Sequence, residues 1–72
     1  MLRNNVELDL KTKCIECGVK QTEVAESIGV SLSYVNRIIR GREQIVNHTF
    51  LKILDELGYD VVLTYEKKDE TE

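Results

Sequence analysis

The sequence predicts a mainly α-helical domain that ends in one β-strand, and three observations lead to this fold class. Apolar residues recur at helical spacing through most of residues 1–58. Glycines separate the periodic segments, and no proline interrupts them. From residue 59 the apolar period changes from about 3.6 to about 2. We therefore expect a helical domain over residues 1–58, a strand over residues 59–66 and a disordered tail over residues 67–72.

Length and charge narrow the class of protein. A chain of 72 residues buries a modest core, so a partner subunit would add stability. No signal peptide or long apolar run is visible, which predicts a soluble, cytoplasmic protein with no membrane partner. The net charge of -3 is unevenly distributed, with +2 over residues 31–48 and -5 over residues 55–72. A local basic segment can bind phosphate, with a modest and strongly salt-dependent affinity.

The first segment has two interpretations. Asn4 and Glu7 have the spacing of a capping box, which predicts a helix from Asn5 to Cys17 that Gly18 ends. Strict alternation of apolar and acidic side chains near residues 6–10 instead indicates a strand. We favour the helix. It would turn three residues toward the core: Leu10, Cys14 and Cys17.

Cys14 and Cys17 form a C-x-x-C motif, which in other contexts marks metal or redox chemistry. A structural zinc site needs about four ligands, and the chain offers only one further good ligand, His48. A redox pair would sit at the start of a helix after a strand, which is not the context here. We therefore interpret both residues as small buried hydrophobes, and we expect no metal and no cofactor.

The middle of the chain predicts two short helices joined by a tight turn. The helices would span residues 22–28 and 31–40, with Gly29 between them in the left-handed backbone region. Ser31 can cap the second helix, and Ala25 is small enough for the two helices to cross closely. The apolar seam would consist of Val24, Ile28, Val30, Val35 and Ile38. Two helices joined in this way form the helix-turn-helix arrangement that binds DNA.

Several positions of different chemical type also agree with one family in a single register. They are Gln21, Ala25, Gly29, Val35 and Ile38, followed by Arg40-Gly41-Arg42. These residues resemble the Cro and Xre family of phage and bacterial repressors, and residues 49–58 (TFLKILDELG) resemble that family's fourth helix and its closing glycine. The resemblance covers about residues 8–58. It implies a lambda-repressor-like domain of four to five helices whose partner is double-stranded DNA.

In that family the second helix of the pair enters the major groove. Val35 and Ile38 would hold its buried side, so the opposite side would read DNA. The expected base-reading residues are Leu32, Ser33, Asn36 and Arg37. Arg37 is the strongest of them, because a guanidinium can bond O6 and N7 of guanine together. The expected phosphate contacts are Gln21, Thr22, Tyr34, Arg40 and Arg42. Ile39 stands where the family often has an acid, and it would extend the core or face a partner.

A last helix precedes the strand. Asn47 can cap it, and Gly58 follows its end near Leu57. Its apolar stripe is Phe50, Ile53, Leu54 and Leu57. Because a lone strand leaves backbone groups unpaired, we expect residues 59–66 to pair with the same strand of a second copy across a two-fold axis. That homodimer interface would contain Tyr59, Val61, Val62, Leu63 and Tyr65. Pairing with residues 6–10 of the same chain is the alternative.

The sequence thus favours a dimeric, bacterial or phage-encoded transcriptional regulator, most simply a repressor of a pseudo-palindromic operator. The first alternative is an antitoxin that uses the same module and also binds a toxin. The second is an interaction adaptor that no longer binds DNA. We expect no enzymatic activity, because there is one histidine, no glycine-rich phosphate loop and no nucleophile–base pair.

Overall fold

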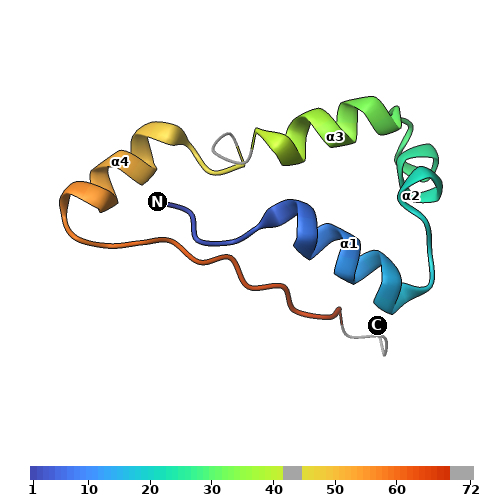
Figure 1. Cartoon of the computed structure of the whole chain (residues 1–72), viewed down its shortest axis with the longest axis horizontal. Coiled ribbons are helices and arrows are strands. Elements are labelled where there is room, and N and C mark those ends of the chain that lie inside the picture. The colour runs from blue at the N-terminus through green and yellow to red at the C-terminus, as the bar shows by residue number, and fades with distance from the viewer. Residues whose placement is uncertain (42–44, 69–72) are drawn as a thin grey trace.

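The structure, a computed structural model, describes residues 1–41 and 45–68, and these residues form four helices (Figure 1). The helices are α1 (Val6–Cys17), α2 (Gln21–Ile28), α3 (Leu32–Arg40) and α4 (His48–Glu56). Every helix start and end lies within one residue of its predicted position. The predicted phosphate contact Arg42 and residues 69–72 of the predicted tail lie outside the described residues. No described helix is long and apolar enough to cross a bilayer.

Side-chain caps start three of the helices. Asn5 Oδ1 accepts a hydrogen bond from the Leu8 amide, which begins α1, at 3.1 Å. Ser31 caps α3 and Asn47 caps α4 in the same way, each at 3.1 Å. These caps occupy amide hydrogens that have no partner inside the helix. The cap of α1 is therefore Asn5 and not Asn4, which leaves Asn4 free for another role.

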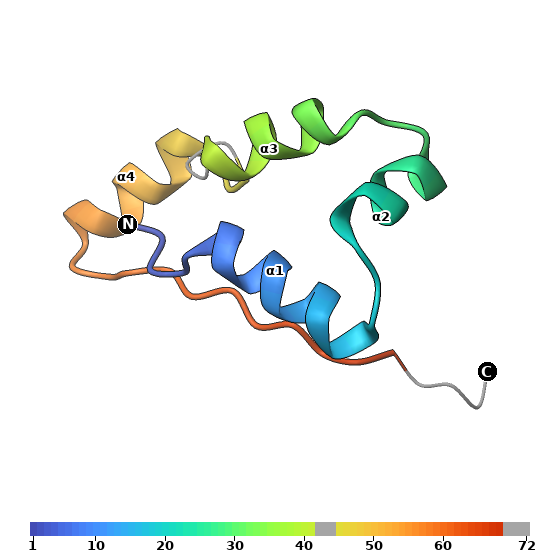
Figure 2. The ribbon, with the colours of Figure 1, turned by 45° about the vertical axis from the view of Figure 1, so that its right-hand side comes forward.

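The helices form an open arrangement rather than a closed bundle (Figure 1). α1 packs against α3, and α2 packs against α3 beside one end of α1. Figure 2 shows α2 and α4 at opposite ends of the molecule, with the C-terminal segment running beside α1. The buried core cluster contains Leu2, Val6, Ile39 and Leu51, with Leu10, Val46, Val61 and Leu63 packed against it. The core is therefore built from both chain termini as well as from the helices.

The C-terminal segment pairs with the N-terminus of its own chain. Val61 donates its amide hydrogen to the Met1 carbonyl at 2.9 Å, and Arg3 donates to the Val61 carbonyl at 2.9 Å. These two bonds make an isolated parallel bridge between Leu2 and Val61. Apart from this bridge, residues 59–68 contain no β-strand. The predicted strand over residues 59–66 is thus reduced to one bridge. The alternative pairing with residues 6–10 is also wrong, because those residues are the first turns of α1 and the C-terminal segment pairs with Leu2 instead.

Asn4 attaches the same segment by imitating a strand with its side chain. Its Oδ1 accepts from the Leu63 amide at 2.7 Å, and its Nδ2 donates to the Leu63 carbonyl at 3.0 Å. Asp9 accepts a second Nδ2 bond from Asn4 at 2.9 Å and a bond from the Tyr65 hydroxyl at 2.7 Å. The hydrogen bonds from Asn4 and Tyr65 hold the pKa of Asp9 below its ordinary value. Burial and the hydrogen bond to Asp9 raise the pKa of Tyr65.

Three predictions of buried side chains are corrected by this packing. Cys14 is buried as expected, but Cys17, which lies about 60° away around α1 in its last position, is exposed. Ile28 is exposed, since α2 meets α3 through Ala25 instead. The apolar stripe of α4 is also largely exposed, and the buried residue of this helix is Leu51.

Candidate nucleic-acid interface

The α2–turn–α3 unit is formed by local chain chemistry. Gly29 has a φ of 81°, and the Val30 amide donates to the Ala25 carbonyl at 2.9 Å, which closes the end of α2. A residue with a Cβ would be strained at that backbone angle. Ala25 is buried, as the predicted close helix crossing requires. The turn and the Ser31 cap together set where α3 begins.

The buried side of α3 differs from the predicted one by one position. Ile39 is 8% exposed and belongs to the core cluster with Val6 of α1, whereas Ile38 is 41% exposed. Adjacent helical residues point about 100° apart, so only one of the two can face α1. Of the two roles considered for Ile39, the structure places it in the core. Val35 is half-buried on the same side of the helix.

This rotation divides the predicted base-reading residues into two pairs. Ser33 and Arg37 are exposed on the outer side of α3. Leu32 and Asn36 are half-buried, because they lie about 20° and 60° from Ile39 around the helix, next to the seam that Val35 and Ile39 form. The side chains most available to a duplex on α3 are Ser33, Tyr34, Arg37 and Arg40. We refer to these four residues as the α3 outer face.

Arg37 is stacked on Tyr34 within the α3 outer face. The guanidinium carbon lies 5.5 Å from the centre of the Tyr34 ring, which is cation–π range. The stack limits the directions that the arginine can explore and keeps its donor groups clear of the helix. Tyr34 therefore acts as a support for Arg37. The sequence carried a signal for this pair, namely an aromatic residue and an arginine at i and i+3 on one helix, and our sequence reasoning did not use it.

The predicted phosphate contacts are spread over two helix ends. Gln21 is the first residue of α2 and is half-buried, and the adjacent Thr22 is exposed. Glu23 accepts a hydrogen bond from the Lys20 amide at 3.0 Å, so a carboxylate already stands at this helix end. Arg40, the last residue of α3, is exposed. The start of α2 thus carries a carboxylate, whereas the arginines of α3, Arg37 and Arg40, are exposed in a segment without acids.

Positive charge is concentrated in α3, in the middle of the chain, and negative charge in the part of the chain from residue 55 onward. Residues 31–41 contain two arginines and no acid. The acids that follow α3 are partly neutralised near the N-terminus, where the Met1 amine lies 3.7 Å from both Asp55 and Asp60, and Arg3 lies 3.8 Å from Asp60. These pairs are exposed, so each contributes little to stability. They place the two cations of the N-terminus beside acids of the C-terminal part of the chain.

The C-x-x-C motif contributes nothing to this surface. Cys14 is buried and Cys17 is exposed, and both are free thiols. Within the described ranges, no group of three or more potential ligands is arranged to hold a metal ion.

A helix capped after a left-handed glycine, crossing a second helix at an alanine and presenting arginines outward, defines a helix-turn-helix module. A comparison with protein families matches residues 10–63 to the helix-turn-helix family of Cro/C1 type. That match covers more than half of the chain, so this protein belongs to the family, which consists of DNA-binding regulators. Searches among curated proteins and among solved structures found no significant match.

Proposed function

We propose that this protein is a sequence-specific transcriptional regulator, acting as a repressor that binds a pseudo-palindromic operator as a dimer. The observation that carries the proposal is the α3 outer face, which is exposed, basic and free of acids over residues 31–41. α3 inserts into the major groove, where its arginines meet base edges and phosphates. The family match supports this use of the helix pair.

Each residue of the α3 outer face has a role in this proposal. Arg37, held by Tyr34, bonds the O6 and N7 of guanine, and Ser33 donates to or accepts from a neighbouring base. Arg40 contacts a phosphate together with Arg42, Gln21 and Thr22, which positions the domain without selecting sequence. Leu32 and Asn36 are half-buried and contact bases only at the edge of the groove.

The dimer is proposed to include the C-terminal segment. On one edge of this segment the backbone groups of Val61 and Leu63 are already hydrogen-bonded. Val61 bonds to the backbone of Met1 and Arg3, and Leu63 bonds to the side chain of Asn4. Because successive residues of an extended chain point their backbone groups to opposite sides, residues 60, 62 and 64 turn theirs away from that pairing. The outer edge is therefore available to a second copy, with the side chains of Tyr59, Val62 and Tyr65 exposed beside it.

Selection of duplexes from a random DNA pool, read by sequencing, tests the proposal. We expect the bound pool to converge on two inverted half-sites about 34 Å apart, or one helical turn. Affinity for the selected sequence should fall steeply with added salt. Selected duplexes that bind no better than random ones at low salt would reject the proposal and favour an adaptor that has lost DNA binding.

A further inference from the structure

The chain exposes more surface than a compact chain of its mass. Its accessible surface is 6142 Å², whereas a folded monomer of 8.3 kDa exposes about 4,600 Å². Its radius of gyration is 14.4 Å, against about 11 Å for a compact domain of this length. The exposed large apolar side chains of the described residues include members of every helix and of the C-terminal segment.

Three of the exposed large apolar side chains lie on one side of α4. Phe50, Ile53 and Leu57 are 49%, 53% and 66% exposed. They are spaced at i, i+3 and i+7, so they form one stripe along the helix, which we call the α4 stripe. Leu51, on a different side, is only 5% exposed and attaches α4 to the core. Because α4 is attached to the core through Leu51, its apolar stripe faces the solvent.

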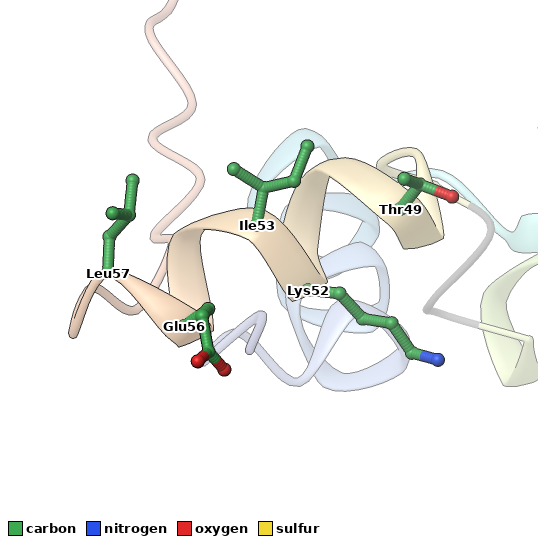
Figure 3. A pocket seen from close by; sticks show the side chains of 5 residues that line it. All are labelled: Thr49, Lys52, Ile53, Glu56 and Leu57. Carbon is green, nitrogen blue, oxygen red and sulfur yellow. The ribbon is translucent and has the colours of Figure 1, made fainter.

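A shallow hollow runs along this face and has charged residues on one border. It is lined by Thr49, Lys52, Ile53, Glu56 and Leu57. Figure 3 shows Ile53 and Leu57 projecting from one edge of α4, and Lys52 and Glu56 projecting from the opposite edge. Among the ion pairs of the described residues, none involves Lys52 or Glu56. The two opposite charges are thus unpaired beside an uncovered apolar stripe.

We propose that the α4 stripe packs antiparallel against the α4 stripe of a second copy of this chain. A two-fold axis near the middle of α4 sets Lys52 of each copy opposite Glu56 of the other, whereas in a parallel pair the two charged borders would lie on opposite sides of the interface and would not meet. Along the chain, the stripe is followed by two further exposed side chains, Tyr59 and Val62, which belong to the proposed C-terminal contact. The inference rests on the proposed dimer but not on DNA binding.

The available area suits this occupant. The excess over a compact monomer is about 1,500 Å² per chain summed over all its residues, polar and apolar, and a specific interface buries about 800 Å² per partner. The α4 stripe, bordered by one cation and one anion, matches the same stripe of a second copy in apolar pattern and in charge. Burying it between two copies also removes the exposed apolar patch that a monomer would carry.

Charge exchange tests the inference, with molar mass measured by sedimentation equilibrium. Lys52→Glu and Glu56→Lys each place like charges across the axis, and each should weaken the dimer by tenfold or more. An equimolar mixture of the two variants should associate again, because every facing pair in the mixed dimer is then of opposite charge. The doubly exchanged chain should behave like the unchanged one. Lys68→Glu makes the same charge change away from α4 and should leave association unaffected.

Two results would overturn the inference, and neither depends on DNA. One is a dimer that neither single exchange weakens; if Val62→Glu then dissociates it, the C-terminal contact alone forms the dimer. The other is a mixture of the two variants that stays monomeric while circular dichroism shows both variants folded. Binding of a single half-site duplex keeps the two proposals apart, since these exchanges leave α3 unchanged and should leave half-site affinity unchanged.

Discussion

α3 and α4 are helices of the same length that meet the rest of the molecule in similar ways but present different outer surfaces. Each is a nine-residue helix with a side-chain cap and one buried residue, Ile39 in α3 and Leu51 in α4. The α3 outer face is polar and basic, whereas the α4 stripe is apolar. Water solvates the first face well, and a duplex can replace that water with phosphate and base contacts. The second face is poorly solvated and gains most from another apolar surface. Exposure alone therefore does not show which kind of partner a surface binds. The chemistry of the exposed side chains indicates the kind of partner.

The largest effect should come from the side of α3 that faces inward. Ile39→Ala removes a side chain of the core cluster and should lower the free energy of unfolding by about 2 to 4 kcal/mol. Ile38→Ala, its neighbour on the outer side, should cost about 1 kcal/mol or less. Urea denaturation of both variants measures the difference. If Ile38→Ala proved the more costly, the rotation of α3 described above would be wrong.

The next effect concerns the response of the α3 outer face to DNA. Arg37→Ala should weaken binding to the selected operator by about 1 to 3 kcal/mol and relax the preference at one base pair. Lys68→Ala removes a cation outside both α3 and α4 and is the matched control. It should leave DNA affinity nearly unchanged at protein concentrations where the dimer is intact. Fluorescence anisotropy with labelled duplexes measures both. An equal loss in the two variants would mean that DNA responds to total charge and not to the α3 outer face.

Arg40 should show a smaller effect that does not depend on sequence. Arg40→Ala should weaken selected and random duplexes by similar factors and lower the slope of log affinity against log salt by about 1. A titration over several salt concentrations measures that slope. If only the selected duplex lost affinity, Arg40 would contact a base instead of a phosphate.

The smallest effect concerns a region that belongs to neither face, the Asp9–Tyr65 contact. The pKa of Asp9 is lowered from 3.8, so its contribution to stability is full above that pH and is lost as the pH falls through the lower folded value. The pKa of Tyr65 is raised from 10.0, so the hydroxyl contribution is lost as the pH rises through the higher folded value. The stability difference between the unchanged chain and Tyr65→Phe should therefore be greatest between these limits and shrink outside them.

Chemical denaturation at several pH values measures this difference, with Asp9→Asn as a second variant. Neither variant should alter half-site affinity, since the contact lies on α1 and the C-terminal segment. A difference that is independent of pH would mean that the Asp9–Tyr65 hydrogen bond does not contribute to stability.

The C-terminal segment shows how far sequence reasoning could reach. The alternation from Tyr59 to Tyr65 predicted a β-strand, whereas the described residues form only the bridge between Leu2 and Val61. Its pairing partner was not predicted, because residues 1–4 are too short and irregular to give a strand signal of their own. The role of Asn4 was missed for the same reason: a capping-box pattern explained it equally well, and only the tertiary contact with Leu63 distinguishes the two.

The sequence by itself determined the helix boundaries, the caps and the glycine turns of this protein, because each depends on groups within a few residues of one another along the chain. Tertiary structure decided which side of each helix is buried. Ile38 and Ile39 have equal hydrophobicity, and the choice between them depends on where α1 lies. The stripe of α4 has the pattern of a buried face, and it faces outward because Leu51 is the side chain that reaches the core. The hydrophobic effect has no preferred direction. An apolar pattern in the sequence therefore predicts which side chains favour burial, and the packing of the other elements determines which of them are buried.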